Sequence, residues 1–417
     1  MLDIKYIREN KEKIILNCRN RNVKIDIDEL LKMDEKRKEY LKKNEDLRAE
    51  RNRKSKGKPS VEDITKLRDL GDNIKMLELE MSKINTTYQD LLAQVPNLTH
   101  PDSPIGGEDD FKVISTNKNP TLFKFKPKDH EELMLSLDLV DFERGAKVAT
   151  SKFYFLKNKM VRFNQALINY GLDIAEKYGY ILLETPDLAK NEIIKGAGFN
   201  PRGEETQVYS IENSDLSLVG TAEIAVGGYH ANEILDLSKG PKKYAALSHC
   251  FRTEAGAYGR TSKGLYRVHQ FTKLELFVFC VPTESEKYHQ ELLNIEKRIV
   301  EGLKLPYRVI DIASGDLGGS AYRKFDLEAW MTMKGGKDEQ GGYGEITSAS
   351  NCADYQARRL NIKYLKEDGL CEYVHTLNGT GIPLSRFPIA IIENYQQKDG
   401  SVKVPKILQK YTGFAKL

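Results

Sequence analysis

The sequence predicts an α+β protein in which a long antiparallel helical hairpin precedes a domain built on an antiparallel sheet. Three observations lead to this prediction. Apolar residues repeat every seven positions within the first hundred residues, and a segment rich in Pro and Gly follows them. Beyond that segment, strand-like and helix-like patterns mix without the strict alternation that a parallel sheet requires.

The size and composition of the chain fit two or three domains with a sizeable core. The chain has 417 residues, of which 40% are hydrophobic. No apolar run approaches the length of a membrane span, and the first ten residues are charged from Asp3 onward, which argues against a secretory signal. We therefore expect a cytoplasmic protein without membrane association.

The cysteine pattern gives no sign of a disulfide framework or a zinc site. The cysteines lie far apart, form no CxxC pair and have no His at metal-ligand spacing. They are Cys18, Cys250, Cys280, Cys352 and Cys371. This pattern is typical of a reducing compartment.

Two amphipathic helices are predicted to follow a short helix in residues 1–22. In the first, Met33, Tyr40 and Leu47 recur every seven residues. A break at 57–60, which reads GKPS, separates it from a second helix with two interleaved heptad series. These series are Leu67, Ile74, Met81, Tyr88 and Val95, and Leu70, Leu77, Ile84 and Leu91. Two heptad helices joined by such a turn predict a projecting coiled-coil hairpin.

Positive charge gathers at the tip of this hairpin. The net charge of the whole chain is only +4, but residues 32–58 contain twelve Lys and Arg against six Asp and Glu. The tip cations are Arg51, Arg53, Lys54, Lys56 and Lys58. Such a run is either an ordinary solvated surface or a contact for a phosphate backbone, and the residues alone leave both readings open.

A linker separates the hairpin from the rest of the chain. Residues 96–107 read PNLTHPDSPIGG and are rich in Pro and Gly. We therefore expect an N-terminal domain at 1–98, a linker at 99–110 and a second domain at 111–417.

Several helices and strands are predicted in the second domain. Met160–Lys177 has a helical pattern, and another helix is expected to begin at Thr283, where Thr283 and Glu286 form a capping box, and to continue to Leu303. Strands are predicted at Tyr307–Ile312, Phe325–Met331 and Tyr373–Leu377. Their order along the chain favours an antiparallel sheet.

The most informative stretch runs from Phe251 to Phe277 and reads FRTEAGAYGRTSKGLYRVHQFTKLELF. Its ends have strand patterns and its middle has the composition of a loop. In the second strand, apolar residues alternate with Lys273 and Glu275. This alternation predicts a half-buried strand and places the two charged side chains on one face.

The loop of this stretch combines glycines with a group of cations. The cations are Arg252, Arg260, Lys263 and Arg267. Glycines and cations suit a loop that folds over phosphates, while the acids Glu254 and Glu275 suit an amine bound beside the anion. A solvated basic hairpin is the alternative reading.

Three further segments contain residue types suited to nucleotide or amino-acid chemistry. Leu218–Glu223 places a hydroxyl two residues before a carboxylate, although an ordinary helix N-terminus would look the same. Tyr343–Ser348 offers the carboxylate of Glu345 and a hydroxyl three residues later, both suitable magnesium ligands. Asn378–Arg386 predicts a glycine-containing turn before a helix, and its arginine could meet a phosphate or form a surface salt bridge.

The loops of several common nucleotide and metal sites are absent from the sequence. It contains no Walker loop, no complete GxGxxG and no HExxH. The P-loop, dinucleotide-binding and zinc-protease classes are therefore disfavoured.

Taken together, these segments resemble the bacterial-type seryl-tRNA synthetases, a class II aminoacyl-tRNA synthetase family, over nearly the whole chain. Phe251–Phe277 is similar to the second class motif and the strand after it, and Gly179–Pro186 to the first, dimer-forming motif. Further similar blocks, in the family's order, are LVGTAEIAV, EITSASNCADYQARR and IAIIENYQ.

The resemblance implies a fold and a two-step reaction. The fold is a class II antiparallel sheet of six strands flanked by helices and paired into a homodimer, with the hairpin gripping the long variable arm of serine tRNA. Serine would attack the α-phosphate of ATP, with Mg²⁺ bound, to give seryl adenylate and pyrophosphate. The 3′ end of serine tRNA, or of selenocysteine tRNA where a cell has it, would then take the seryl group.

The resemblance also assigns roles to individual residues. Arg252, Glu254 and Arg386 would be catalytic, binding the α-phosphate, the adenine side and the γ-phosphate, and no general base is required because positioning and charge neutralisation suffice. The implied ATP contacts are Arg252, Thr253, Glu254, Val268, His269, Gln270, Phe271, Glu345, Ile346, Thr347, Ser348 and Arg386. The implied serine contacts are Thr221, Ala222, Glu223, Arg252, Glu275, Asn378 and Thr380. Glu345 and Ser348 would hold Mg²⁺, and Arg51, Arg53, Lys54, Lys56 and Lys58 would bind tRNA.

The chain departs from the family pattern at three places. Thr380 stands where many members have Ser. Gly344 stands where a basic residue is usual, after a Gly-rich insertion at 334–342. Pro383 and Phe387-Pro388 make the third motif unusual around its arginine. These departures affect local loop geometry but remove no group that the chemistry requires.

Two alternatives to an active synthetase can be weighed from the sequence. A catalytically silent paralogue, kept as a tRNA-binding or structural protein, would be expected to have lost Arg252, Glu345 or Arg386, and this chain has all three. A ligase that transfers an activated amino acid to a carrier protein would not be expected to keep the basic hairpin, which this chain has.

Overall fold

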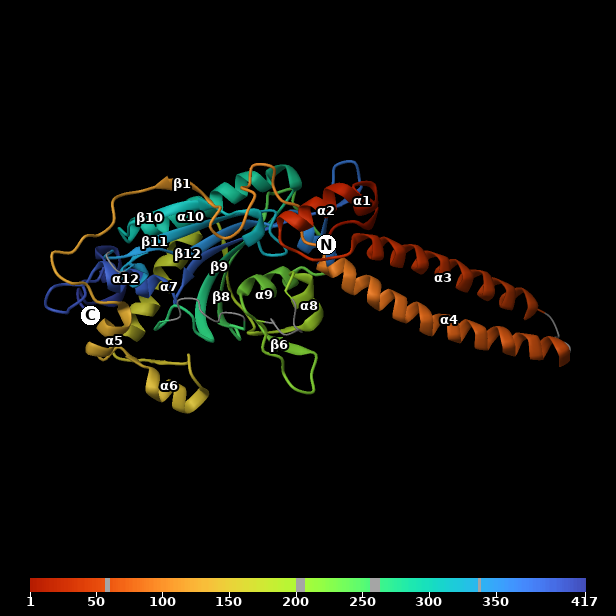
Figure 1. The fold of residues 1–417 in the computed structure, drawn as a ribbon, viewed down its shortest axis with the longest axis horizontal. Coiled ribbons are helices and arrows are strands. Elements are labelled where there is room, and N and C mark those ends of the chain that lie inside the picture. The colour runs from red at the N-terminus through yellow and green to blue at the C-terminus, as the bar shows by residue number, and fades with distance from the viewer. Residues whose placement is uncertain (57–60, 200–206, 256–262, 337–338) are drawn as a thin grey trace. The chain divides into compact units, whose positions relative to one another are not determined.

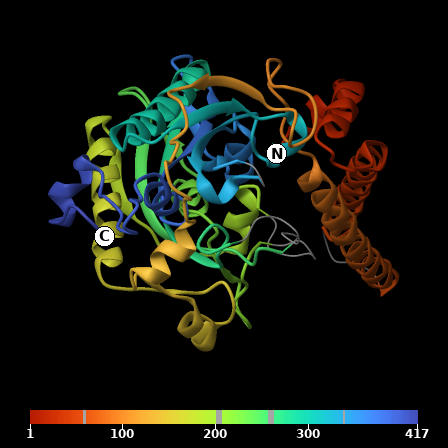
Figure 2. The ribbon, with the colours of Figure 1, turned by 60° about the vertical axis from the view of Figure 1, so that its left-hand side comes forward.

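The structure is a computed structural model that describes residues 1–56, 61–199, 207–255, 263–336 and 339–417 (Figure 1). By its contacts, the chain divides into two compact units, Met1–Leu98 and Thr99–Leu417. The described part of the first unit is helical, and the second unit has a large sheet with helices on both of its faces (Figures 1 and 2).

Two short helices, not one, form the start of the first unit. α1 spans Ile4–Glu9 and α2 spans Lys11–Asn20. Asn10 separates them, because its side chain donates a hydrogen bond to the carbonyl of Tyr6 (3.1 Å) and its backbone leaves the helical region. The single helix predicted for residues 1–22 was therefore wrong.

The predicted helical hairpin is confirmed. α3 spans Ile27–Lys54 and α4 spans Val61–Gln94, and the two helices pack against each other (Figure 1). Asp26 caps α3 by accepting a hydrogen bond from the backbone N–H of Glu29 (2.9 Å). Every residue of the two heptad series is buried or half-buried, whereas most other described residues of α4 are exposed. The apolar seam therefore holds the hairpin together.

A buried carboxylate ties the base of the hairpin to the short helices. Asp34 is fully buried and forms ion pairs with Arg8, with Arg37 (3.1 Å) and with Lys38 (2.7 Å). Burial acts to raise the pKa of Asp34, but the cations outweigh it, so that the pKa is lowered. The Arg37 guanidinium lies 4.8 Å from the ring centre of Tyr88 on α4. Positions 34 and 88 thus belong to the core of the first unit.

An eight-stranded sheet organises the second unit, in the order β1-β10-β11-β12-β15-β9-β8-β4. Its strands are β1 (Lys112–Thr116), β4 (Ile181–Glu184), β8 (Lys242–Phe251), β9 (Gln270–Cys280), β10 (Tyr307–Asp311), β11 (Arg323–Met331), β12 (Gly342–Asn351) and β15 (His375–Pro383). All neighbours pair antiparallel except β4, which lies parallel to β8 at one edge. The antiparallel sheet is confirmed, with two strands more than the six that the resemblance implied.

Smaller elements surround this sheet. The helices are α5 (His130–Ser136), α6 (Phe142–Ala149), α7 (Lys159–Lys177), α8 (Asn191–Gly196), α9 (Ala222–Tyr229), α10 (Ser285–Gly302), α11 (Tyr355–Leu360), α12 (Phe387–Asn394) and α13 (Gln409–Thr412). The short strands are β2 (Val140–Asp141), β3 (Phe155–Leu156), β5 (Leu188–Lys190), β6 (Leu216–Leu218), β7 (Ile234–Leu235), β13 (Lys363–Leu365) and β14 (Cys371–Tyr373). Turns of 3₁₀ helix are η1 (Pro282–Glu284), η2 (Ser314–Asp316), η3 (Thr332–Lys334) and η4 (Lys406–Leu408).

Helices cover both faces of the central strand β9. The even-numbered aliphatic residues from Leu274 to Val278 join the core cluster that includes α7 and α10, whereas Phe277 and Phe279 join a second cluster with α9 and α11. The half-buried strand predicted from alternation was therefore wrong, because a second layer of helices covers the other face. Lys273 and Glu275 lie on the face of Phe277, as predicted, and they form an ion pair.

Close packing holds α7 on the sheet. A Cβ atom at Gly171 would lie 2.8 Å from methyl groups of Leu274 on β9 and Ile382 on β15, which is too close for any real contact. Glycine at this position therefore allows the helix to lie directly on the two central strands. The predicted helix at Met160–Lys177 is confirmed, with α7 beginning one residue earlier.

Two predicted element boundaries in this unit were wrong. The helix expected to begin at Thr283 with a capping box begins at Ser285, and no side chain caps it. Pro282 starts the 3₁₀ turn η1 before it, because its fixed φ angle suits the first position of a helical turn. The strand predicted at Tyr373–Leu377 is divided, since β14 ends at the first of these residues and β15 begins two residues later.

The turn predicted at Asn378–Arg386 is mostly strand. β15 runs through Pro383, and only residues 384–386 form the turn before α12. The glycine at 379 serves close packing rather than turning, since a Cβ atom on it would lie 3.0 Å from the side chain of Leu292 on α10.

β12 and β15 pair over only part of their length. Their pairing covers Ala349–Asn351 and Leu377–Gly379 and then stops. Beyond it, β12 stays paired with β11, and β15 stays paired with β9. The two neighbouring strands therefore part within the sheet.

The structure shows the state of the cysteines and the character of the helices. The five cysteines are free, and four of them are buried while Cys371 is exposed. Among the helices of the described ranges, none is long and apolar enough to cross a membrane.

Candidate active site

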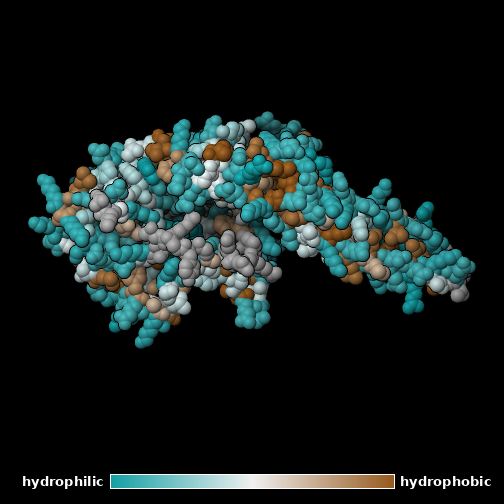
Figure 3. Space-filling view, viewed as in Figure 1, coloured by the Kyte–Doolittle hydropathy of each residue, from teal (hydrophilic) through white to brown (hydrophobic). Residues whose placement is uncertain are grey.

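One cavity in the second unit brings most of the predicted site residues together. It has a volume of about 950 Å³ and lies where β12 and β15 part. The predicted residues that line it are Thr221, Glu223, Arg252, Glu254, Val268, Phe271, Glu275, Glu345, Ile346, Ser348, Asn378, Thr380 and Arg386. Figure 3 shows a hollow on this unit, with mainly hydrophilic residues along its upper rim.

Five predicted residues do not line this cavity. Ala222 is fully buried in the first turn of α9. Thr347 points away from the cavity, and its hydroxyl donates a hydrogen bond to Glu296 on α10 (2.9 Å). The ring of His269 lies 2.9 Å from the backbone carbonyl oxygen of Arg252, where it braces the loop. The other two are Thr253 and Gln270.

The start of α9 forms one end of the cavity. Thr221 caps this helix by accepting a hydrogen bond from the backbone N–H of Glu223 (3.3 Å). The Thr221 hydroxyl also accepts a hydrogen bond from Nζ of Lys273 (2.9 Å) and donates one to Glu275 (3.3 Å). Thr221 thus caps an ordinary helix N-terminus and also belongs to the polar site, two readings that the sequence left as alternatives.

Glu223 is a buried carboxyl group at this end. Its Oε1 accepts hydrogen bonds from the amides of Gln356 (2.6 Å) and Asn378 (3.0 Å). Burial, and after it the charge of Glu275, raise the pKa of Glu223 to about 7. Lys273 is the cation that forms an ion pair here, with Glu275, while Arg252 acts on Glu223 from farther away, so Glu223 has no ion-pair partner of its own in the described residues.

Arg252 lies in the wall between the two ends. Its Nε donates a hydrogen bond to the carbonyl of Gly220 (3.2 Å), and its guanidinium lies 5.3 Å from the ring centre of Phe271. No carboxylate in the described ranges forms an ion pair with Arg252. Its remaining N–H groups can therefore serve a bound anion.

An ion pair joins the two arms of the loop after β8. Nη1 of Arg267 lies 3.2 Å from a carboxylate oxygen of Glu254. Glu254 has a φ angle of +53°, a left-handed conformation that is uncommon for a residue with a side chain. Arg260, another cation of this loop, lies outside the described residues.

Unpaired guanidinium donors mark the other end of the cavity. Arg386 stacks on Tyr266, with Cζ 3.5 Å from the ring centre. Nη1 of Arg386 and Nε of Arg267 are buried, and in the described structure neither has a hydrogen-bond partner. Because a buried N–H without a partner is costly, these donors point to an anion that is not part of the chain.

A buried pair of His130 and Glu393 fixes the backbone around this end of the cavity. His130 donates from Nδ1 to Glu393 on α12 (2.8 Å), since its Nε2 accepts a hydrogen bond from the backbone N–H of Leu265 (3.1 Å). The other carboxylate oxygen of Glu393 accepts a hydrogen bond from the backbone N–H of Met333 (3.1 Å). The loop, α5, α12 and the connection after β11 are therefore fixed to one another.

A bulge in β12 places Glu345 and Ser348 on one side of the strand. A spacing of three residues would put them on opposite faces of a regular strand. The pairing with β11 skips Ile346, since adjacent residues of β11 lie opposite Glu345 and Thr347. The extra residue restores a common face, and both side chains line the cavity.

The surroundings of Glu345 suit a divalent cation shared with phosphates. Withdrawal from bulk water acts to raise the pKa of Glu345, but the cations around it, Arg386 and Lys324 first among them, lower it below its ordinary value. An ionised carboxylate and the hydroxyl of Ser348 are hard oxygen ligands. In the described ranges, no group of three or more His, Cys, Asp and Glu could hold a metal by itself. Mg²⁺ would therefore need phosphate and water oxygens as its other ligands.

Lys273, Tyr266 and Lys324 also line the cavity, although they were not predicted as site residues. Alternation in β9 could have found Lys273, because it shares the face of Glu275. The other two gave no signal, since their places depend on how the loop returns to the sheet and on β11 lying beside β12.

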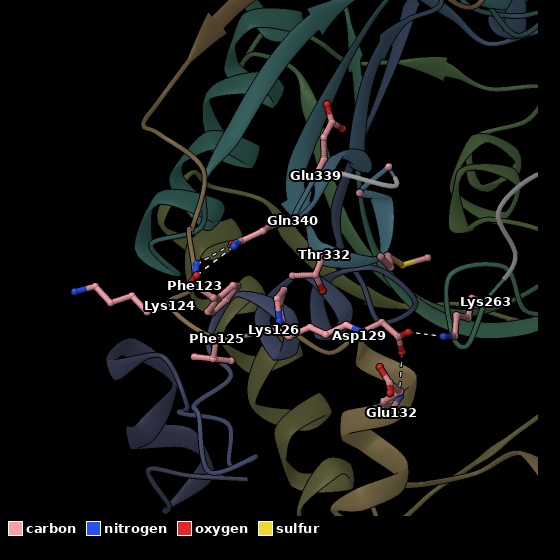
Figure 4. Close-up of a pocket in the computed structure, with 14 residues that line it drawn as sticks. Phe123, Lys124, Phe125, Lys126, Asp129, Glu132, Lys263, Thr332, Glu339 and Gln340 are labelled. Carbon is pink, nitrogen blue, oxygen red and sulfur yellow. Dashed lines mark hydrogen bonds and ion pairs between the residues drawn. The ribbon is translucent and has the colours of Figure 1, made fainter.

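A second cavity, of about 880 Å³, lies between residues 123–127, the start of α5 and the connection after β11 (Figure 4). Gln340 holds this segment by accepting a hydrogen bond from the backbone N–H of Phe123 (2.9 Å) and donating one to its carbonyl (3.2 Å). The charged residues that line the cavity are Lys124, Lys126, Lys263, Asp129, Glu132 and Glu339. The charges balance, so this cavity favours neither an anion nor a cation.

The cations at the hairpin tip are exposed where the structure describes them. Arg51, Arg53 and Lys54 lie in the last turn of α3, and Lys56 follows it. Lys54 forms an ion pair with Glu50 (2.7 Å), whereas neither Arg53 nor Lys56 pairs with any described acid. Lys58, which was also predicted to bind tRNA, lies outside the described residues.

Two family models match this chain, each over a different part of it. Residues 207–395 match the family model of the tRNA synthetase class II core domain (G, H, P, S and T). Residues 1–99 match that of the seryl-tRNA synthetase N-terminal domain. Over its full length, the chain is 49% identical to a serine–tRNA ligase of Treponema denticola, of which it covers 100%.

The chain belongs to the seryl-tRNA synthetase family. A serine–tRNA ligase of Dictyoglomus thermophilum is also 49% identical, with 100% of this chain and 99% of that protein covered. Among solved structures, seryl-tRNA synthetase from Pyrococcus horikoshii complexed with ATP has a TM-score of 0.87 at 38% identity, covering 100% of this chain and 99% of that one. The cytoplasmic serine–tRNA ligase of Naegleria fowleri in complex with AMP has a TM-score of 0.82 at 33% identity, with coverage of 100% and 98%. The family resemblance seen in the sequence is therefore confirmed, and the chain is an aminoacyl-tRNA synthetase.

Proposed function

We propose that the chain activates L-serine with ATP to give seryl adenylate and then transfers the seryl group to the 3′ end of serine tRNA. The supporting observation is the cavity between β12 and β15. One end has two buried carboxyl groups with one ion-paired lysine between them, and the other has unpaired guanidinium donors. A zwitterionic amino acid and a polyphosphate would each find complementary charge there.

The serine end would bind the substrate as follows. The ammonium group supplies the ion-pair partner that Glu223 lacks, and the carboxylate turns to Arg252. Thr221 and Thr380 both line the cavity, and the Thr380 hydroxyl can form a hydrogen bond with the serine hydroxyl, whereas the Thr221 hydroxyl would do so by giving up one of its present partners. An analogue without that hydroxyl would leave buried polar groups unpaired, which is a strong basis for discrimination.

The ATP end would position the phosphates for attack. The Arg252 fork holds the serine carboxylate beside the α-phosphate, Phe271 supplies a ring for stacking on the base, and Arg386 clamps the γ-phosphate. An oxygen of the serine carboxylate bonds to the α-phosphorus, and the bond from that phosphorus to the bridging oxygen breaks, so that pyrophosphate leaves with that oxygen. Mg²⁺ at Glu345 and Ser348 would neutralise phosphate charge during this step.

The first unit would bind tRNA. The cations at the hairpin tip, Arg51, Arg53, Lys54, Lys56 and Lys58, would contact the phosphate backbone of the long variable arm. We therefore assign residues 1–98 to tRNA binding, 99–110 to the linker and 111–417 to catalysis. Selenocysteine tRNA would be a second acceptor where a cell has it.

We also propose a cytoplasmic homodimer joined at Gly179–Pro186. β4 in this segment is an edge strand, and its residues Ile181 and Leu182 are 56% and 38% exposed. Exposed apolar residues on an edge strand favour association with another chain.

A catalytically silent paralogue is less consistent with this site. Arg252, Glu345 and Arg386 all line the cavity, and their charges are complementary to those of the substrates. A ligase for carrier proteins is disfavoured by the basic hairpin.

The reaction can be tested by serine-dependent exchange of pyrophosphate into ATP. We expect exchange with serine and Mg²⁺, and little with other amino acids. Arg252→Ala should lower the rate by roughly a hundredfold or more, because it removes a preorganised partner of the α-phosphate. Exchange that is absent in the wild-type chain, or unchanged in the variant, would contradict the proposal.

A further inference from the structure

Lys334 is a cation that lies against Tyr266, a residue that lines the cavity, although Lys334 is not itself one of the lining residues. It ends the turn η3 after β11, and its Nζ lies 4.1 Å from the ring centre of Tyr266. This is the ring on which Arg386 stacks, at 3.5 Å. The turn is well fixed, because Thr332 donates a hydrogen bond from its hydroxyl to the carbonyl of Lys128 (3.0 Å) and the backbone N–H of Met333 donates to Glu393.

Glycine at position 344 makes room for this lysine. A Cβ atom on Gly344 would lie 2.9 Å from Cε of Lys334 and 3.1 Å from the hydroxyl oxygen of Tyr266. A side chain at position 344 would therefore displace the end of the Lys334 side chain from its present place. The residue before Glu345 and the lysine of the insertion occupy one place in the structure.

Two cations, Arg386 and Arg267, and two acids, Glu328 and Glu345, act on Lys334. In the described part of the chain, no carboxylate lies within ion-pair distance of it. Burial lowers the pKa of Lys334, and Arg386 and Arg267 lower it further, while the acids Glu328 and Glu345 oppose them. Glu328 is itself paired with Arg308 (2.5 Å). Three cations thus lie near one another, with Glu345 as the nearby acid that is not already paired with Arg308.

We propose that Lys334 binds the β- and γ-phosphates of ATP and the pyrophosphate that leaves. The inference rests on the proposed function, because it concerns the same cavity. Arg386 and Arg267 have buried N–H donors that lack a hydrogen-bond partner in the described structure. Lys334 lies near them, at the end of the turn η3 that follows β11. Four rotatable bonds allow its ammonium group to move from the Tyr266 ring to a phosphate oxygen.

Direct nucleotide binding provides the test. Lys334→Ala and Lys334→Gln should weaken ATP and pyrophosphate binding by roughly tenfold, as expected for a lost charged contact. AMP lacks the phosphates in question, so its affinity should stay unchanged. Lys334→Arg, which keeps the charge, should retain most of the ATP affinity. Titration calorimetry with each ligand measures these differences without relying on turnover.

A double variant tests whether positions 334 and 344 share one place. Gly344→Arg alone should weaken ATP binding, since the new side chain collides with Lys334. In the Lys334→Ala background, the same substitution should restore ATP affinity, because the space is then free and the cation returns. A double variant that binds ATP no better than Lys334→Ala would overturn the shared-place argument.

Controls separate this inference from the proposed function. Lys124→Ala removes an exposed lysine of the second cavity and should leave all three affinities unchanged. Unchanged ATP affinity in Lys334→Ala, or an equal loss for AMP, would overturn the role of Lys334. Failure of the proposed function would appear differently, as absence of serine-dependent exchange in the wild-type chain.

Discussion

Glu223 is a carboxyl group whose ionisation the fold opposes. The pKa of Glu223 is raised to about 7 by burial and by Glu275, whereas an unfolded glutamate titrates near 4.5. Between these two values the folded chain holds a proton that the unfolded chain has released. Stability therefore falls as the pH rises from about 4.5 to 7 and then stays level.

Glu223→Gln should remove this pH-dependent loss of stability. The amide oxygen of glutamine can still accept the hydrogen bonds of Gln356 and Asn378. The free energy of unfolding of the variant, minus that of the wild type, should grow by up to roughly 3 kcal/mol between pH 4.5 and 7, because each unit of pKa shift is worth about 1.4 kcal/mol. Urea titrations across this pH range measure the difference.

The matched control for this experiment is Glu212→Gln, which removes an exposed carboxylate. Its stability difference from the wild type should not change over the same pH range. A difference for Glu223→Gln that is equally flat would contradict the raised pKa. Serine affinity should fall in the Glu223 variant alone.

At the residue scale, the sequence predicted the identities of the polar groups better than their orientation. Glu275 and Lys273 could be placed on one face because alternation along a single strand is a local property. Thr347 and Ser348 could not be separated, because the bulge at Ile346 decides which of them faces the cavity. No sequence pattern predicted the place of Lys334, since that place depends on its contact with Tyr266, which is distant in sequence.

At the scale of elements, the hairpin was predictable because its packing repeats with its own sequence. The heptad residues of α4 lie against α3, so periodicity contains nearly all of the information. β9 was harder, because burial of both faces depends on helices more distant in sequence. The boundary at Ser285 was missed for a local reason, since Pro282 has a stronger effect on the backbone than the capping box.

The hairpin tip allows a test that leaves the catalytic unit intact. Arg53→Gln together with Lys56→Gln should weaken tRNA binding and make it less dependent on salt, by roughly one unit of the logarithmic slope for each lost phosphate contact. Serine-dependent pyrophosphate exchange should be unchanged, since it needs no tRNA. Binding is measured by filter assays over a salt series.

Lys239→Gln with Lys398→Gln is the matched control, because both lysines are exposed in the second unit. This pair should leave the salt slope unchanged. Equal slopes for the tip variant and the wild type would contradict the role of the tip. Shortening of the hairpin should spare Asp34 and Tyr88, which belong to the core of the first unit.

At the scale of the whole molecule, the edge strand β4 predicts how two chains associate. Ile181→Asp should shift the protein from dimer to monomer, because a charge replaces an exposed apolar side chain on an unpaired edge. Sedimentation velocity measures the change. Leu122→Asp, at a position that is 77% exposed, should leave the association state unchanged. A wild-type chain that is already monomeric would contradict the proposed homodimer.

The order of the strands could not be derived from the residues. β9 lies between β8 and β15, which are separated by more than a hundred residues, and no local pattern in any of them specifies such a neighbour. The mixed order of strands and helices favoured an antiparallel sheet, and the family resemblance gave it six strands, two fewer than the structure has.

The parting of β12 and β15 has a consequence for motion within the sheet. Backbone hydrogen bonds join these strands only at Ala349–Asn351 and Leu377–Gly379, so the two halves of the sheet share a short seam. A seryl adenylate bound between Ser348 and Thr380 would connect the halves where the backbone does not. The adenylate would add a contact across this gap, beside the one that Glu296 of α10 makes with Thr347 and Thr380. Transfer of the seryl group to tRNA and release of AMP would remove that contact and leave the two strands freer to move relative to each other.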